Sequence, residues 1–469
     1  MNPRTVILGA GPAGLGAAFQ ITRRSLGPVT ILEQNTAPGG SAGSFVVEGV
    51  NVDYGSHRLH PACDRRILRD LKELLGDDLL LRPRHGRIRL QGRWLRFPLE
   101  PLDLLLHLPP AFTAGAALDI VRRHFTRKPR EDTYASVLER GLGGTISRRF
   151  FFPYARKIWG VEPEMLSAVQ AHRRVSLNSP AKMLRKIAAV IPGLQSPGSN
   201  RYYYPRHGYG EISEKLADAI RQADGDLKFR ARVTSLERAW PDWRVHYERS
   251  GDACVIECAR VWSTLPITTL ARCLPDRPAE ILDAARRIEF RSLILIYLVL
   301  EQDRFSEFDA HYFPDEDVPL TRVSEPKNYS AVSQPAGITV LCGELVCTPN
   351  ADCWSATDQQ LGEAMLDWLS AAGIPVKAPL RRVVTRRIPQ AYPLYLHGFE
   401  QYFDMIDAWV AGHDALLTFG RQGLYAHENL HHALHQGYSA ADCLHAGGVF
   451  DQARWTTFRK SFEHHVVED

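Results

Sequence analysis

Six consecutive residues near the start of the chain have the spacing of a phosphate-binding loop. Gly9 to Gly14 fit G-x-G-x-x-G and lie between an apolar run, residues 4–8, and a helical stretch. In this motif the first glycine permits a tight turn, the second lets the backbone approach a pyrophosphate, and the third lets helix and strand pack closely. Glu33 ends a second apolar run, 28–33, at the interval expected for an acid that binds a ribose hydroxyl. The residues predicted to contact a dinucleotide are Gly9, Gly11, Pro12, Ala13, Gly14, Glu33 and Gln34.

Two further motifs would support other chemistry. Gly39 to Gly43 fit G-x-S-x-G, the serine hydrolase elbow, but that elbow follows a buried strand, whereas loop-forming residues 35–38 precede it here. We interpret these glycines as a second loop beside the cofactor phosphates. His427 to His431 fit H-E-x-x-H, in which two histidines on one helix face bind zinc and the glutamate acts as a base. Because His435 lies one helical turn further on, a zinc hydrolase stays open as a remote alternative.

The elements expected around these motifs alternate as in an α/β protein. Strands at 4–8 and 28–33 flank the first helix, so the chain opens as a βαβ unit. We further expect a helix over 64–75, a hairpin over 84–98, a helix-rich stretch over 99–195, a helix from about 210, strands over 227–264 and 293–300, and a last helix over 429–444. The glycine motif is therefore expected between a strand and a helix, as the dinucleotide interpretation requires.

Composition and charge narrow the class of protein. The 469 residues exceed what one core usually holds, so two or three subdomains are expected. A net charge of +4 is small for this length and does not favour nucleic acid as a partner. The eight cysteines form no C-x-x-C pair, and we see neither a secretory signal nor an apolar run long enough to span a membrane. We therefore predict a cytoplasmic globular protein, and the sequence leaves its oligomeric state open.

Six blocks of sequence, in order along nearly the whole chain, carry a resemblance to a known family. The blocks are Gly9–Gly14 with Glu33, Pro38–Ala42, Val52–His60, Tyr154–Gly160 with Arg173–Val175, Asp317–Lys327, and Phe419–Ala433. Together they resemble the flavin amine-oxidase superfamily and, within it, the UDP-galactopyranose mutase family and related FAD-dependent oxidoreductases such as the protoporphyrinogen oxidase-like proteins. One block would be weak evidence, whereas six in order make the resemblance specific. It implies that the bound dinucleotide is FAD.

The resemblance also implies an architecture. We expect an α/β fold in which a Rossmann-like FAD-binding domain carries a helical insert and a mostly antiparallel substrate-domain sheet. The FAD-binding domain is expected to be discontinuous, over residues 1–84, 200–268 and 413–469. A helical substrate or lid domain is expected over 99–199, and the antiparallel-sheet domain over 85–98 and 269–412.

Site residues follow from the positions that match the family's motifs. Further cofactor contacts implied in this way are Gly40, Ser41, His57, Val233, Gly420, Arg421, Asn429, Leu430 and His431. Implied substrate contacts are Trp159, Arg173, Arg174, Arg322 and Tyr392, and the residues implied in the chemistry are Arg174, Arg322, His57, Tyr425 and His427. Two guanidinium groups can bind a diphosphate bidentately, which is the physical reason for Arg174 and Arg322. Composition alone does not support this role, since 47 of the 57 basic residues are arginine.

The chain departs from the family at its C-terminal motif. His427 stands where the family has a tyrosine that reaches substrate phosphate, and Asn429-Leu430-His431 replace Asp-Met-Asp. A neutral imidazole at His427 still donates one hydrogen bond, whereas His431 replaces a carboxylate and adds a titratable cation at the flavin's pyrimidine edge. Positive charge at that edge favours acceptance of a hydride by the flavin.

The first hypothesis is therefore an FAD-dependent oxidoreductase that moves a hydride to or from a cyclic, sugar-like, anionic substrate. The alternative is a UDP-galactopyranose mutase-like isomerase of sugar rings that uses reduced FAD without net redox. The expected partner is a small molecule, either a nucleotide sugar or another glycosyl compound, and no metal ion is expected. The sequence identifies neither the substrate nor the electron acceptor.

Overall fold

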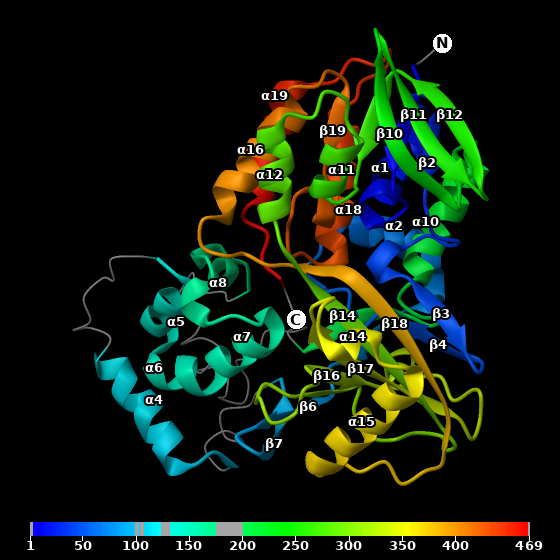
Figure 1. Ribbon diagram of the computed structural model, residues 1–469. Coiled ribbons are helices and arrows are strands. Elements are labelled where there is room, and N and C mark those ends of the chain that lie inside the picture. The colour runs from blue at the N-terminus through cyan, green and yellow to red at the C-terminus, as the bar shows by residue number, and fades with distance from the viewer. Residues whose placement is uncertain (1–2, 99–102, 104–106, 123–131, 175–199, 468–469) are drawn as a thin grey trace.

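The computed structural model describes residues 3–98, 103, 107–122, 132–174 and 200–467 of the chain. Its first layer is a five-stranded parallel sheet in the order β19-β13-β1-β2-β9. The strands are β1 (Thr5–Leu8), β2 (Val29–Leu32), β9 (Asp226–Lys228), β13 (Arg260–Ser263) and β19 (Leu416–Thr418). Stretches far apart in the sequence therefore meet in one sheet, in the upper part of Figure 1.

The first helix, α1 (Pro12–Arg23), is buried along most of its length because other helices cover it. Its apolar side chains share one core with those of α10 (Glu211–Gln222) and α18 (Leu430–Asp442). Helix α18 comes so close to α1 that a Cβ at Gly437 would lie 2.2 Å from the carbonyl oxygen of Ala13. An early helix and a late helix thus pack backbone against backbone.

A second, mostly antiparallel sheet has the order β18-β14-β17-β16-β15-β6-β7 and lies below the first in Figure 1. The strands are β6 (Gly86–Leu90), β7 (Arg93–Phe97), β14 (Phe290–Leu300), β15 (Ala310–Tyr312), β16 (Arg322–Ser324), β17 (Thr339–Cys347) and β18 (Leu380–Pro393). Strand β14 is buried almost throughout because β17 and β18 pair with its two edges and apolar clusters cover both faces. The pair of β15 and β6 is the parallel exception.

Smaller β elements and further helices complete these two layers. The three-stranded antiparallel sheet is β10 (Ala231–Ala239), β11 (Asp242–Arg249) and β12 (Asp252–Cys258), and the two-stranded pairs are β3 (Ser44–Val47) with β4 (Val50–Asp53) and β5 (Leu79–Pro83) with β8 (Arg201–Pro205). Besides α1, α10 and α18, the α-helices described outside the insert are α2 (Arg65–Leu75), α11 (Ile267–Cys273), α12 (Ala279–Arg287), α13 (Pro326–Ser330), α14 (Asp352–Ser355), α15 (Asp358–Ala371), α16 (Phe399–Ala411), α17 (Gly420–Gly423) and α19 (Gln452–Phe462).

The helical insert forms a lobe beside the second sheet (Figure 1). Its described helices are α4 (Pro110–Arg122), α5 (Tyr134–Leu142), α6 (Gly144–Ile146), α7 (Phe152–Trp159) and α8 (Ala168–Arg174). Lys157 fastens α7 to the sheet, because its Nζ donates to the carbonyl oxygens of Phe313 (2.5 Å), Asp315 and Leu320 (3.3 Å). Because the Lys157 side chain is buried where the lobe contacts the sheet, its ammonium group is poorly hydrated, and this lowers the pKa of Lys157 to about 8.

Most of the expected elements are confirmed. The opening βαβ unit is β1, α1 and β2, the helix over 64–75 is α2, and the hairpin is β6 and β7. The buried strand over 293–300 is part of the longer β14, and the last helix begins at Leu430 rather than Asn429. The predicted fold class is confirmed, while the helical expectation for 175–195 lies outside the described residues. The division into three domains stays a proposal.

His311 on β15 makes the fold sensitive to acid. Its side chain is buried among the rings of Trp94, Phe305 and Phe308, and this burial, with the nearby Arg87, lowers the pKa of His311 to about 4. An unfolded histidine has a pKa of about 6.5. The unfolded chain therefore binds the extra proton first, and this group's contribution to stability, complete above pH 6.5, is lost as the pH falls toward 4.

We expect acidification from pH 7 to pH 5 to remove about 2 kcal/mol of unfolding free energy through His311 alone. The measurement compares chemical denaturation of the wild type and of His311→Phe at both pH values. The stability difference between the two proteins should shift by this amount in favour of the variant at pH 5. A difference that does not change with pH would show that His311 takes up its proton as easily in the folded protein as in the unfolded chain.

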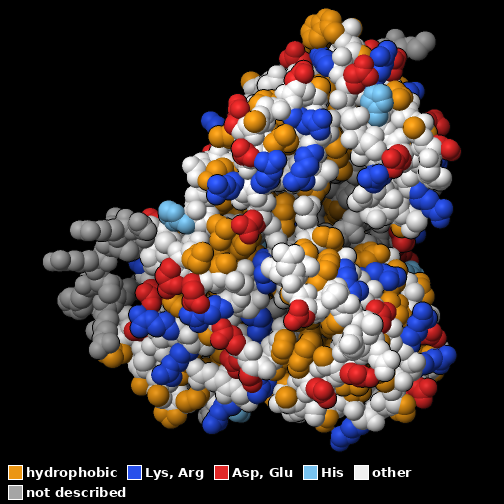
Figure 2. Space-filling view, viewed as in Figure 1, with side chains coloured by type: hydrophobic (Ala, Val, Ile, Leu, Met, Phe, Trp, Pro, Cys, Tyr) orange, Lys and Arg blue, Asp and Glu red, His pale blue; other side chains and the backbone are white. Residues whose placement is uncertain are grey.

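The surface adds little that is specific. Basic and acidic side chains are interspersed over the face in Figure 2 and gather into no single-sign field there, in keeping with the small net charge. Among the described residues, no helix has the length and apolar character that crossing a membrane requires.

Candidate functional site

The glycine motif forms a cradle at the start of α1. Gly9 has φ +102°, and a Cβ at Gly14 would lie 2.1 Å from the carbonyl oxygen of Gly9, so neither position accepts a side chain. At Gly11 the space where a Cβ would stand is open, with no atom within 4 Å. Helix α1 begins there without a side-chain cap, which leaves its N-terminal amides and the positive end of its dipole to a bound anion. This geometry fits the pyrophosphate of a dinucleotide.

Three other segments converge on this cradle. Glu33 lies at the end of β2, and its Oε2 accepts from the Ala10 amide (2.8 Å), which aligns the carboxylate with the glycine turn. The second glycine loop reaches the first, because Gly39 N donates to Ala10 O (2.8 Å) and Gly40 lies next to Gly11. Gly420 closes the other side, where an added Cβ would lie 2.9 Å from that of Ala13. The residues present therefore fit an extended dinucleotide such as FAD.

A central cavity opens between this cradle and the second sheet. From the cofactor side it is lined by Pro12, Ser41, Ala42, Asn429, Leu430 and Ala433, and from the sheet by Leu293, Tyr312, Thr321, Arg322, Glu344, Val346, Ile388, Ala391 and Tyr392. The loop after β4 contributes Tyr54 to Arg58, and the remaining walls are Tyr154, Ile158, Tyr209, Arg421, His427, Glu428 and Val467. The cavity thus has the cofactor segments on one side and a wall rich in tyrosine and arginine on the other.

A buried carboxylate holds the loop that carries His57. Asp53 accepts hydrogen bonds from Ser44 Oγ (2.6 Å), the Tyr204 hydroxyl (2.6 Å) and the Tyr209 amide (2.9 Å), although burial raises the pKa of Asp53. The His57 ring stacks on the Tyr209 ring with centroids 5.1 Å apart. Burial also lowers the pKa of His57, against the opposing charge of Asp53, so that this imidazole is neutral at pH 7.

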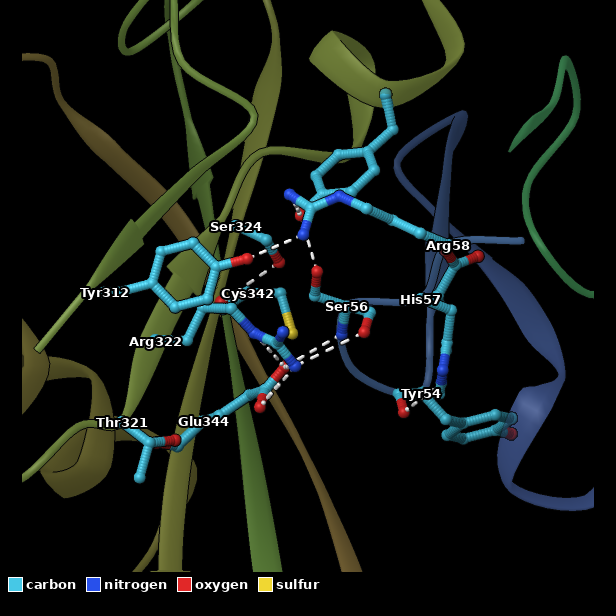
Figure 3. A network of polar contacts seen from close by, with 12 residues as sticks. Tyr54, Ser56, His57, Arg58, Tyr312, Thr321, Arg322, Ser324, Cys342 and Glu344 are labelled. Atoms are coloured by element: carbon cyan, nitrogen blue, oxygen red, sulfur yellow. Dashed lines mark hydrogen bonds and ion pairs between the residues drawn. The ribbon is translucent and has the colours of Figure 1, made fainter. Parts of the chain in front are cut away.

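Arg322 and Glu344 form a buried ion pair on neighbouring strands (Figure 3). Arg322 Nε and Nη2 donate to Glu344 Oε1 (3.0 and 2.7 Å), and Nη2 also donates to Oε2 (2.9 Å). Their side chains are 17% and 3% exposed. Burial alone would lower the pKa of Arg322, but the Glu344 carboxylate and nearby tyrosines raise it well above its ordinary value. Arg322 faces the cavity as predicted, and its charge is already balanced.

Arg58 is the centre of a second network in the same wall. Its Nη1 donates to the Tyr312 hydroxyl (2.6 Å), and its Nη2 donates to Tyr329 (3.1 Å) and pairs with Asp309 (3.3 Å). Tyr202 also donates to Asp309 (3.0 Å). Figure 3 shows the Tyr312 hydroxyl turned toward the Arg58 guanidinium, on the side of the wall next to Arg322. Arg58 therefore positions a tyrosine of the cavity with its own charge balanced.

Another part of the cavity wall comes from the C-terminal motif and the end of β18. Arg421 donates to the carbonyl oxygens of Glu428 (2.6 Å) and Ala391 (3.0 Å), which ties this motif to β18. The rings of Tyr392 and His427 lie 5.2 Å apart on the cavity surface. Asn429 and Leu430 reach the same cavity where α18 begins. The structure therefore brings together Tyr392, His427 and Arg421, three of the predicted site residues.

Three predicted site residues do not reach the cavity surface. The Tyr425 hydroxyl donates to the carbonyl oxygens of Leu394 (2.8 Å) and Glu289, so this phenol is buried and occupied. Trp159 is 1% exposed and packs behind Tyr392 and His427. His431 lies in the first turn of α18, 5% exposed, and does not line the cavity. Trp159 and Tyr425 thus lie behind the cavity surface, and their predicted roles in substrate binding and chemistry stay predictions.

Gln34, Val233 and Arg173 are not among the residues that line the cavity. Gln34 is exposed just after β2, and Val233 is on β10, which packs against that strand. The guanidinium of Arg173 stacks over the Tyr395 ring at 5.7 Å, outside the cavity lining, and its carbonyl oxygen accepts from Val467 N (2.8 Å). Arg174 ends α8, and its side chain lies outside the described residues.

The zinc alternative conflicts with the local geometry. Helix α18 starts at Leu430 with Asn429 as its N-cap, so His427 and His431 do not share a helix face. The Glu428 carboxylate is not placed as the base of a zinc site, because its two oxygens contact His465 Nδ1 (2.9 Å) and Gln436 Nε2 (2.6 Å). Within the described residues, three potential ligands come close enough to share a metal ion only at Asp78, His207 and Glu211, which are outside this motif.

Sequence reasoning missed four functional candidates in the cavity, namely Arg58, Tyr312, Glu344 and Tyr209. Arg58 directly follows His57 in the sequence, and this position next to a predicted site residue could have identified it as a candidate. Tyr312 and Glu344 come from strands that gave no motif, and only the strand register places them beside Arg322.

The fold and the cradle define a dinucleotide-binding flavoprotein. The chain belongs to the family of flavin containing amine oxidoreductases, whose model matches residues 12–445. It is accordingly a flavin-dependent enzyme whose cofactor is FAD, and the predicted resemblance is confirmed.

Solved structures share this fold. The reduced UDP-galactopyranose mutase superposes with a TM-score of 0.79 at 22% identity over 94% of this chain and 95% of that one. A putative protoporphyrinogen oxidase from Exiguobacterium sp. 255-15 has a TM-score of 0.72 at 18% identity over 94% and 98%. Cyclohexylamine oxidase from Brevibacterium oxydans IH-35A has a TM-score of 0.66 at 17% identity over 98% and 100%. At these identities the likeness concerns the fold.

Proposed function

We propose that this enzyme is an FAD-dependent oxidoreductase that acts on a cyclic, sugar-like small molecule. The observation that carries the proposal is the composition of the central cavity. The lining combines the cofactor-binding segments with the rings of five tyrosines and with guanidinium groups; the tyrosines are Tyr54, Tyr154, Tyr209, Tyr312 and Tyr392. Tyrosine offers a flat apolar face and a hydroxyl group, the combination that suits a ring bearing polar substituents.

The residues of the chain supply binding and orientation in this proposal. When bound, the flavin exchanges a hydride with the substrate. The tyrosine rings confine the substrate, and Arg322 and Tyr312 orient its polar groups from the sheet side. His57, neutral at pH 7, contributes a hydrogen-bonding side chain without adding charge to the cavity. We place Ser41, Asn429, Leu430 and Arg421 among the contacts to the cofactor.

The test is anaerobic mixing of the oxidised enzyme with candidate glycosides and nucleotide sugars. A substrate of the oxidoreductase should bleach the flavin absorbance, and an added electron acceptor should restore it. A sugar ring isomerase behaves differently, because it needs reduced flavin but returns it unconsumed. Interconversion of ring forms by the dithionite-reduced enzyme, with no bleaching of the oxidised enzyme by any compound, would therefore reject the proposal in favour of the mutase alternative.

A further inference from the structure

Three neighbouring strands place three polar side chains in one row on the cavity wall. Tyr312 of β15 is the register partner of Arg322 on β16, and Arg322 is the register partner of Glu344 on β17. Side chains directly opposite one another on adjacent strands lie about 5 Å apart on the same face of a sheet. All three residues line the central cavity, so a ligand meets the row from one side.

Each member of this row has hydrogen-bonding capacity that no bond within the described residues uses. Tyr312 accepts from Arg58, which occupies its oxygen, and in the described part of the chain its own proton has no acceptor. Arg322 uses Nε and Nη2 for Glu344 and Ser56, and no bond within the described residues takes its Nη1. Among the described residues, Glu344 Oε2 accepts only from Arg322 Nη2, whereas a carboxylate oxygen accepts about two bonds. The row thus offers donors and an acceptor side by side.

The charge of the row is balanced. Arg322 is neutralised by Glu344, and Arg58 behind Tyr312 is paired with Asp309. A hydroxyl group both donates and accepts a hydrogen bond, so it can take a bond from Arg322 and give one to Glu344. An ionised phosphate has only acceptor oxygens, so it can take a bond from Arg322 but give none to Glu344, and the balanced row offers its negative charge no net attraction.

We infer that the row of Tyr312, Arg322 and Glu344 selects a neutral ring with neighbouring hydroxyl groups over its phosphorylated counterpart. This inference rests on the proposed function, because it assigns the substrate class of the same cavity. It replaces the anionic substrate expected from the sequence with a neutral polyol ring. Tyr312 and Glu344 are then residues that determine specificity. They contact the substrate ring from the sheet, and the bound flavin would face that ring from the cofactor side of the cavity.

The first experiment titrates the FAD-loaded enzyme and follows the change in flavin absorbance on binding. The neutral probes are myo-inositol and methyl glucopyranoside, the anionic probes are myo-inositol 1-phosphate and glucose 6-phosphate, and cyclohexanol is a ring with a single hydroxyl. We expect at least one neutral polyol to bind more tightly than its phosphate and than cyclohexanol. Tighter binding of the phosphates, or failure of both neutral polyols to bind, would overturn the inference.

A matched pair of variants tests the row itself. Tyr312→Phe removes a hydroxyl of the row, whereas Tyr202→Phe removes a hydroxyl that bonds Asp309 behind Arg58 and does not line the cavity. We expect Tyr312→Phe to weaken polyol binding about tenfold, the scale of one lost hydrogen bond, and Tyr202→Phe to leave it unchanged. Equal effects of the two variants would mean that the network acts only through the fold, and would contradict a specificity role.

A charge variant provides the reverse test. Glu344→Gln keeps the side-chain shape and removes the negative charge, so the phosphates should gain affinity relative to the polyols. If this variant does not fold, the Tyr312 and Tyr202 pair still decides the question. All these measurements report binding without turnover. Polyol binding, with ring interconversion by the reduced enzyme and no bleaching of the oxidised enzyme by any compound, would therefore reject the oxidoreductase proposal alone. Bleaching by a phosphorylated ring in preference to the neutral one would reject the specificity inference alone.

Discussion

The Gly11→Asp variant is expected to fold normally and to lose the yellow colour of bound FAD. Gly11 has φ −74°, which any residue adopts, and no atom lies within 4 Å of the place where its Cβ would stand. The protein therefore tolerates the side chain, but the carboxylate would stand against the cofactor's pyrophosphate at the N-terminus of α1. Replacing attraction by repulsion there should weaken FAD binding on the order of 100-fold.

The measurement is the flavin absorbance of purified protein together with its circular dichroism. The wild type should release about one FAD per chain, and the variant should show the same secondary structure without the flavin spectrum. Gly11→Ala is the matched control, because it fills the same space without charge and should retain more FAD than the aspartate variant. A yellow Gly11→Asp protein with full FAD content, or a colourless wild type that FAD does not reconstitute, would refute this assignment of the cradle.

Glu344→Ala should be among the most destabilising substitutions in the chain. It removes the partner of Arg322, whose side chain is 17% exposed, and leaves a charged guanidinium without compensation inside the protein. Breaking one partner of a buried ion pair costs about 3–5 kcal/mol. Because Glu344 Oε1 also accepts from the Ser56 amide (2.8 Å), the loop beside His57 should loosen at the same time.

Chemical denaturation of the FAD-loaded protein measures this loss. The control is the double variant Glu344→Met with Arg322→Met, which replaces the pair by apolar side chains and should recover most of the stability. A single variant that loses less than about 1 kcal/mol would show that solvent reaches Arg322 and that the pair behaves as a surface salt bridge.

The parts of the fold that could be predicted from the sequence are those that a short stretch of residues determines by itself. The glycine turn, α1 and β2 follow from residues within one βαβ unit, and their spacing carries the information. The start of α18 could not be derived in this way, because the histidines that suggested a zinc helix lie on both sides of its N-cap, Asn429. A zinc helix would have to include both His427 and His431, whereas the hydrogen bonds of α18 begin only after Asn429.

The site was harder to predict because its partners are distant in sequence. The family's motif implied a role for Tyr425 in the chemistry, yet its hydroxyl donates to the carbonyl oxygen of Glu289, 136 positions away. Arg322 looked like a free anion site until the register of β16 with β17 placed Glu344 beside it. Whether Glu344 neutralises Arg322 depends on how β16 and β17 pair, and the sequence of neither strand alone determines that pairing.

The contact of α1 with α18 also constrains how the protein is made. Arg24, just after α1, bonds the carbonyl oxygen of Ala441 across 417 positions, and Gly437 packs against the backbone of α1. On the ribosome, the phosphate-binding loop therefore emerges long before the helix that covers its supporting core. Until α18 arrives, the apolar face of α1 is exposed and must be shielded from aggregation. We therefore expect the FAD site to be completed only after α18 has been synthesised.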